Sequence, residues 1–196
     1  MTDFSIEDTH PGKIIAGVDE VGRGPLAGPV VTAAVIVDRA VVIEGIKDSK
    51  KLSKKKREEL FEKISLHYKC SVGIISPAEI DRINILEATK KACQMAVRSL
   101  EIEPDIVLVD GNMKFSDERF CSIIKGDDKS VSIAAASIIA KVTRDRMMEE
   151  LGVEFPEYKW AQNSGYGTKD HIDAIIKHGA TPHHRRSFRV RGFNYS

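Results

Sequence analysis

The sequence lacks most of the features that mark secreted, membrane-bound or zinc-binding proteins. Its three cysteines, Cys70, Cys93 and Cys121, lie far apart and form no C-x-x-C pair, which argues against zinc and predicts buried, reduced thiols. No apolar run approaches the roughly 20 residues that a membrane-spanning helix needs. The polar and acidic first ten residues are unlike a signal peptide. These absences predict a cytoplasmic protein that does not bind membranes.

Net charge is also lacking, because 30 Lys and Arg residues balance 29 Asp and Glu residues. The overall balance therefore indicates nothing about partners, but the distribution of charge does. Residues 47–57 and 183–191 are both strongly basic. A charge run is often only a solvated helix face. Two basic runs in a chain that also carries grouped acids favour a polyanion as the ligand.

The pattern of apolar residues predicts a single α/β domain over residues 1–196, and a hydrophobic content of 42% excludes disorder. Apolar runs bounded by turn residues predict five strands, at about residues 13–18, 29–37, 70–75, 105–110 and 120–125. Caps and helical periodicity predict helices that start near 53, 76, 84, 130 and 168. We expect helices on both faces of the sheet.

Three segments are expected to lie outside this central sheet. Residues 1–12 look like a frayed lead-in, and residues 39–46 are expected to add a short edge segment. Residues from about 160 to 196 are predicted to form a small C-terminal segment of helix and loop.

Acidic residues follow three of the predicted buried strands. Asp19 and Glu20 follow the first, Asp110 ends the fourth, and Asp127 and Asp128 come after the fifth. Because buried strands bring their ends together at a sheet edge, these carboxylates are expected to lie close enough to repel one another unless cations bind. An all-oxygen set suits Mg²⁺ or Mn²⁺. The pattern predicts phosphodiester hydrolysis on nucleic acid with two such ions.

A glycine-rich turn follows the first acid pair. Gly22, Gly24 and Gly28 let the backbone approach a ligand closely, and Arg23 is suited to a phosphate contact. The spacing also resembles a dinucleotide-binding loop. That motif has to open a helix, whereas residues 29–37 are rich in β-branched residues and predict a strand, so we reject this alternative.

Six motifs occur in order along the chain and closely resemble the ribonucleases HII, the type 2 ribonucleases H. They are Gly17–Pro25, Asp48–Leu52, Val109–Asn112, Lys125–Asp127, Ala135–Asp145 and Gly165-Tyr166. The resemblance extends from about residue 13 to 188. It implies a ribonuclease H-like fold, endonucleolytic cleavage of RNA in RNA–DNA hybrids, and incision 5′ to single ribonucleotides embedded in duplex DNA, giving 3′-hydroxyl and 5′-phosphate ends.

The resemblance also implies roles for individual residues. The family's four metal-binding acids match Asp19, Glu20, Asp110 and Asp127, so Asp128 is left out. The backbone of Gly22, Arg23 and Gly24 is expected to read the 2′-hydroxyl, and the ring of Tyr166 to pack on the sugar of the following deoxynucleotide. Lys50 is expected to contact a backbone phosphate, as are Arg144 and Arg186.

The chain departs from the family pattern in two places. Asn163-Ser164 stand where many bacterial relatives have His-Lys, so a phosphate contact from that lysine is not expected here, and the sequence stops soon after Phe188. The absence of a substrate-binding domain before the first strand favours ribonuclease HII over HIII. A monomer is expected. The alternatives are cleavage of hybrids without preference for the junction, and a non-catalytic nucleic-acid-binding module that uses the basic segments.

Overall fold

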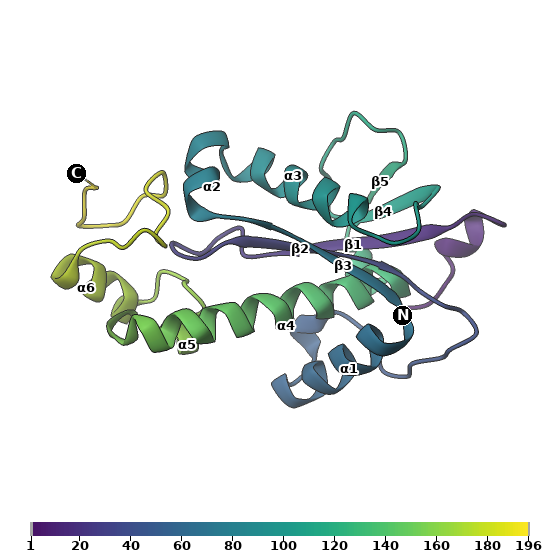
Figure 1. Cartoon of the computed structure of the whole chain (residues 1–196), viewed down its shortest axis with the longest axis horizontal. Helices are drawn as coiled ribbons and strands as arrows, with labels where there is room; N and C mark the ends of the chain where they lie inside the picture. Colours follow the sequence, from purple (N-terminus) through teal and green to yellow (C-terminus); the bar gives the residue numbers. More distant parts are fainter. Residues whose placement is uncertain (1, 196) are drawn as a thin grey trace.

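The computed structural model describes residues 2–195 and builds them around one five-stranded mixed sheet (Figure 1). The strands are β1 (Ile15–Val21), β2 (Val30–Ile36), β3 (Lys69–Ile75), β4 (Ile106–Asp110) and β5 (Phe120–Ile123). Their order across the sheet is β3-β2-β1-β4-β5. β2 pairs antiparallel with β1 and β3, whereas β4 pairs parallel with β1 and β5. The predicted mixed α/β sheet is confirmed.

Helices cover both faces of the sheet, as expected. They are α1 (Lys54–His67), α2 (Pro77–Ile83), α3 (Ile85–Arg98) and α4 (Val131–Glu154). Figure 1 shows α2 and α3 on one face, with α1 and α4 on the other. Cys93 and Ala96 of α3 pack on Val18 of β1. Ala136 of α4 belongs to the opposite core with Val35 of β2. The alanine-rich start of α4 therefore lies close against the sheet.

Gly17 explains how close that approach is. A Cβ atom at Gly17 would overlap the backbone of Ser132, so glycine at this position lets the first turn of α4 lie directly on β1. Asp19 follows two residues later on the same strand. The start of α4 is thus packed beside the predicted metal ligands.

The C-terminal segment forms a small core of its own at the far end of α4. It contains η4 (Pro156–Tyr158), α5 (Trp160–Asn163), α6 (Lys169–His178) and the loop that follows. Trp160 is fully buried and donates a hydrogen bond from Nε1 to His171 Nε2 at 2.9 Å. His171 in turn lies 3.2 Å from His184, which comes from the final loop.

Two expectations for the flanking segments are wrong. Residues 3–9 are not frayed: Asp3 forms a parallel bridge with Ser130, and Glu7 is buried in η1 (Glu7–Thr9). Residues 39–46 form no strand. Both segments lack a strong local pattern, so contacts with distant residues decide their conformation.

The cysteines are free, as predicted, although only Cys93 is buried while Cys70 and Cys121 are half-buried. Among residues 2–195, no helix combines the length and the apolar character that crossing a membrane would require.

Candidate active site

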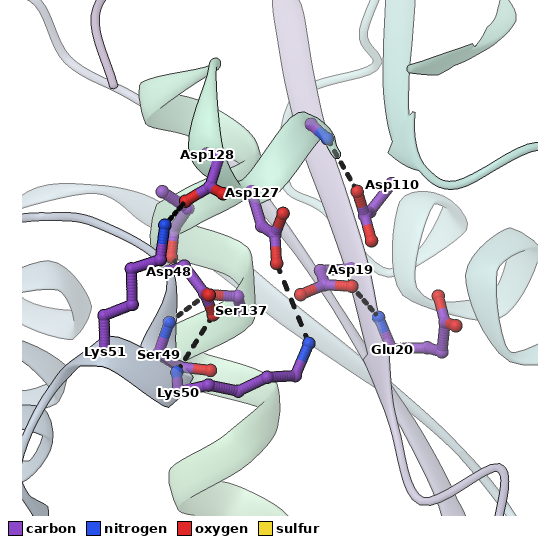
Figure 2. A network of polar contacts seen from close by, with 12 residues as sticks. Asp19, Glu20, Asp48, Ser49, Lys50, Lys51, Asp110, Asp127, Asp128 and Ser137 are labelled. Atoms are coloured by element: carbon purple, nitrogen blue, oxygen red, sulfur yellow. Dashed lines mark hydrogen bonds and ion pairs between the residues drawn. The ribbon is translucent and has the colours of Figure 1, made fainter. Parts of the chain in front are cut away.

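The four carboxylates predicted as metal ligands come together at one end of the sheet (Figure 2). Asp19 and Glu20 lie on β1 itself, whereas the sequence placed them just beyond a strand. Asp110 is the last residue of β4, and because β4 runs parallel to β1 with Val18 opposite Val109, Asp110 and Asp19 are neighbours. Asp127 lies in the turn η3 (Gly126–Asp128), between β5 and α4.

Repulsion and burial act together on these acids. Asp19 is only 7% exposed, and burial, followed by the negative charges of Glu20 and Asp110, raises its pKa well above the ordinary value. Burial also raises the pKa of Glu20, against the attraction of Arg23. Burial and Asp110 raise the pKa of Asp127, while Lys50 opposes them. The cluster therefore gains most from a cation that neutralises several carboxylates at once.

The donor atoms fit a hard divalent ion. They are all carboxylate oxygens, the ligands that Mg²⁺ and Mn²⁺ prefer. Glu20 Oε2 is buried and has no hydrogen-bond partner, so this oxygen is free for a ligand. In residues 2–195, no three His, Cys, Asp or Glu side chains are already arranged to hold an ion. Like charges repel one another, so a bound cation would favour a closer arrangement of these carboxylates.

Backbone groups orient two of these acids. Asp110 Oδ1 accepts a hydrogen bond from Gly126 N at 2.7 Å, which ties β4 to the turn that carries Asp127. Asp19 Oδ1 accepts from Glu20 N, also at 2.7 Å. Asp128, which the sequence analysis left out, turns away and forms an ion pair with Lys51. Figure 2 shows Asp127 directed toward Asp19 and Asp128 directed toward Lys51.

Lys50 lies next to Asp127 with its Nζ 3.8 Å from Asp127 Oδ2, and its side chain is 78% exposed. Its segment is fixed from behind, because Asp48 Oδ1 accepts from Lys50 N and Ser137 Oγ of α4 accepts from Ser49 N. Burial lowers the pKa of Lys50, but attraction from Asp19 and Asp48 outweighs this and leaves the pKa raised. The ammonium group is therefore charged and able to turn toward a phosphate.

The glycine-rich turn has a conformation that only glycine adopts easily, with φ of +92° at Gly22 and +84° at Gly28. Its inner side is occupied by a fully buried arginine, Arg185. The guanidinium donates to Gly22 O at 2.5 Å, to Arg23 O at 2.9 Å and to Gly28 O at 2.8 and 3.0 Å. Within residues 2–195 it forms no ion pair, and burial lowers its pKa to about 9 although the charge of Asp81 opposes the shift.

Arg144 occupies a similar position, which does not fit the predicted phosphate contact. It is fully buried, and its guanidinium donates to the carbonyl oxygens of Pro29, Ala27 and Ser164 at 2.9–3.1 Å. Burial lowers its pKa to about 10. All of these contacts are to backbone, so Arg144 stabilises the turn and the Ser164 loop and is not directed at solvent.

Tyr166 lies beside this turn and is 46% exposed. A Cβ atom at Gly24 would be 3.6 Å from the Tyr166 ring, so the ring and the turn form one continuous surface. The two loops are bonded directly, because Leu26 N donates to Gly165 O at 2.8 Å. The structure thus brings Tyr166 together with Gly22–Gly24, as the resemblance implied.

Arg186 is exposed, in contrast to Arg185, and its backbone N donates to Asp81 Oδ2 at 2.8 Å. Its side chain remains available for a phosphate. Sequence reasoning gave no role to Asp48, which supports Lys50, or to Arg185, which supports the glycine-rich turn. The burial of Arg144 did have a signal in the sequence, since Arg144 follows Ala140 and precedes Met148 at spacings of four on the buried face of α4.

The comparisons with known proteins agree with this geometry. The family model described as Ribonuclease HII matches residues 16–191. A ribonuclease HII of Rickettsia rickettsii (strain Sheila Smith) is 70% identical over 183 residues, which cover 93% of this chain and 95% of that protein. The crystal structure of ribonuclease H2 from Pyrococcus horikoshii OT3 is similar with a TM-score of 0.74 at 32% identity, covering 90% of this chain and 94% of that one. The ribonuclease HII of Archaeoglobus fulgidus, solved as a complex with PCNA, is similar with a TM-score of 0.76 at 30% identity, covering 92% and 98%.

Proposed function

The chain belongs to the ribonuclease HII family and is a metal-dependent endonuclease that hydrolyses RNA in RNA–DNA hybrids; we propose that it also incises duplex DNA on the 5′ side of an embedded ribonucleotide. The main support for this proposal is that the acid cluster and the surface formed by the glycine-rich turn and Tyr166 are continuous. The cluster of Asp19, Glu20, Asp110 and Asp127 adjoins the turn of Gly22–Gly24, which in turn contacts Tyr166.

We propose that the four acids hold two Mg²⁺ or Mn²⁺ ions when substrate is bound. The chemistry that such a pair supplies is activation of a water molecule and stabilisation of the leaving oxygen, which gives a 3′-hydroxyl and a 5′-phosphate. The unpartnered oxygen of Glu20 and the raised pKa values of Asp19 and Asp127 support this, because each of these groups is stabilised by a cation.

The backbone of the turn supports recognition of the ribose. The carbonyls of Gly22 and Arg23 both accept from Arg185 on the inner side. In a trans peptide the N–H of the next residue points the opposite way, so the N–H groups of Arg23 and Gly24 face outward. Neither N–H donates to another protein group within residues 2–195. They are suited to donate to a 2′-hydroxyl oxygen.

Tyr166 is proposed to test the nucleotide that follows. Its exposed ring lies next to the turn that reads the ribose, so a deoxy sugar can pack on it whereas a 2′-hydroxyl would collide. Lys50 and Arg186 are exposed cations, and we propose that both contact phosphates of the substrate backbone. Since one chain supplies every one of these groups, we propose that a monomer acts on nucleic acid. A cytoplasmic location stays a prediction.

The test uses an end-labelled DNA duplex with a single ribonucleotide, incubated with Mg²⁺, with Mn²⁺ or with chelator. We expect one metal-dependent cut 5′ to the ribonucleotide. Asp127→Asn should lower cleavage by about 100-fold or more, because the cluster loses one charged ligand. The neighbouring Asp128→Asn is the matched control and should retain cleavage. Full turnover of the Asp127→Asn protein would contradict the assignment of the metal ligands.

A second pair of variants separates junction recognition from general hybrid cleavage. Tyr166→Ala should lose activity on the single-ribonucleotide duplex while activity on a long RNA–DNA hybrid persists. Tyr166→Phe keeps the ring and should behave like the unchanged protein. Equal activity of Tyr166→Ala on both substrates would favour cleavage without preference for the junction.

A further inference from the structure

We propose that Glu7 is a positioning residue for the metal centre, and that the N-terminal segment 3–9 thereby sets the affinity for divalent ions. The inference rests on the proposed function of Asp110 and Asp127 as metal ligands. It starts from a feature that the active site does not use, a buried carboxylate that comes from outside the sheet and ends at the first turn of α4.

Three donors converge on one oxygen of Glu7. Oε1 accepts from Ser130 Oγ at 2.6 Å, from Ser132 Oγ at 2.6 Å and from Ser132 N at 3.1 Å. Both serines are buried, and Ser132 N is one of the N–H groups at the start of α4 that have no acceptor within the helix itself. A carboxylate at this position satisfies those donors and interacts favourably with the positive end of the 24-residue helix.

The same turn connects to the metal ligands by short backbone bonds. Ser130 N donates to Gly126 O at 2.8 Å and so closes the turn that contains Asp127. Gly126 N, on the other side of that turn, donates to Asp110 Oδ1 at 2.7 Å. Ser130 therefore lies one hydrogen bond from the residue that orients Asp110 and three residues from Asp127. Movement of Ser130 would displace both ligands.

Ser132 makes the corresponding connection to β1. Its backbone packs directly on Gly17, two residues before Asp19, with no room for a Cβ atom between them. The rest of the N-terminal segment reinforces the arrangement, because Asp3 N donates to Lys129 O at 3.2 Å and Val131 N donates to Asp3 O at 3.2 Å. Residues 3–9 thus cover the back of the turn whose front carries the carboxylates.

This geometry predicts an unusual order among substitutions. Only Oε1 of Glu7 is used, and Oε2 is buried with no partner, so an acceptor at the right distance matters more than the charge. Glu7→Gln keeps the acceptor and should bind metal nearly as well as the unchanged protein. Glu7→Asp keeps the charge but is one methylene too short, so it should resemble Glu7→Ala.

The experiment measures Mn²⁺ binding in the absence of substrate, from the electron paramagnetic resonance signal of free Mn²⁺. We expect Glu7→Ala and Glu7→Asp to raise the Mn²⁺ dissociation constant about 10-fold, the usual scale for loss of a group that orients a ligand. Glu7→Gln should stay within about twofold. Asp8→Asn is the matched control, because Asp8 pairs with Arg39 and does not contact the turn. Binding of the duplex in chelator should be unchanged in all four variants.

Two comparisons decide the outcome. If Asp127→Asn weakens Mn²⁺ binding and Glu7→Ala does not, Glu7 has only a structural role and the inference is wrong. If Asp127→Asn leaves Mn²⁺ binding unchanged, the proposed metal centre itself is wrong. Circular dichroism checks that each variant folds. Should Glu7→Ala fail to fold, Ser132→Ala removes a single donor, and an unchanged Mn²⁺ affinity in that variant would overturn the inference.

Discussion

Arg185 is the residue whose loss should most sharply separate stability from substrate contact. We consider Arg185→Met, which keeps most of the apolar volume and removes every donor. The acceptors Gly22 O and Gly28 O are buried and would lose their partners, while Arg23 O is partly open to water. A buried acceptor without a partner costs about 1–3 kcal/mol, so the two set a scale of about 2–6 kcal/mol.

Two further effects change that figure. The guanidinium is buried and forms no ion pair within residues 2–195, so removing it releases a desolvation penalty of about 3 kcal/mol, which offsets part of the loss. The cation also packs over the Phe188 ring at 5.0 Å, a contact worth about 1 kcal/mol that is lost. With the middle of the range for the two acceptors, we therefore expect a net destabilisation of about 2 kcal/mol.

Urea denaturation measures this change, with Arg186→Met as the matched control. Arg186 is exposed, so its substitution should alter the free energy of unfolding by no more than about 0.5 kcal/mol. In cleavage assays, Arg186→Met should be the more impaired of the two variants. It should weaken substrate binding in a salt-dependent way, because the proposed phosphate contact is lost. An Arg185→Met protein whose free energy of unfolding equals that of the unchanged protein would refute the reasoning.

Three further predictions concern buried charge and close packing. Asp19→Asn should abolish cleavage yet raise the melting temperature in chelator, because burial raises the pKa of Asp19 and its ionised form opposes folding at neutral pH. Each kcal/mol gained in unfolding free energy should raise the melting temperature by about 2–4 °C, and Mn²⁺ should stabilise only the unchanged protein. Gly17→Ala should destabilise the protein by about 3 kcal/mol in urea denaturation, since its Cβ atom would overlap the backbone of Ser132. Burial and His171 lower the pKa of His184 to about 4. Neutral His184 therefore stabilises the folded protein above the unfolded pKa of about 6.5, and this stabilisation is lost as pH falls toward 4. The difference in unfolding free energy between the unchanged protein and His184→Gln should shrink over that interval, whereas a constant difference would contradict the burial of a neutral His184.

The four proposed metal ligands could be located from the sequence because each one follows a local signal, either an apolar run or a short motif. Asp110 ends an apolar run, and Asp19 belongs to one, so the acids were expected at a sheet edge without knowledge of the topology. The pairing that makes them neighbours, β1 parallel to β4 with about 90 residues between, has no local signal. Asp127 lies in a turn beyond β5 and was distinguished from Asp128 only through the family motif.

The residues that were missed interact only with distant partners. Glu7 contacts Ser130 and Ser132, more than 120 residues away, and nothing in the first ten residues marks it as buried. Arg185 and Arg186 are adjacent and chemically identical, and the loop that carries them has no periodicity to show which one faces inward. A repeating pattern predicts the orientation of a side chain in a helix or strand, but a loop provides none.

The glycine-rich turn and the acid cluster differ in how completely their polar groups are satisfied within the protein. Arg185 satisfies the carbonyl oxygens on the inner side of the turn, and this leaves the N–H groups of Arg23 and Gly24 on its outer side for the substrate. Within residues 2–195, the four carboxylates at the neighbouring sheet end have only two cationic partners, Arg23 at 3.5 Å from Glu20 and Lys50 at 3.8 Å from Asp127. A turn with its internal hydrogen bonds complete and an acid cluster with its charge unbalanced therefore lie side by side. We expect the first to stay rigid when substrate binds and the second to depend on cations. Changes in metal concentration should therefore alter the rate of cleavage far more than they alter which ribonucleotide is cut.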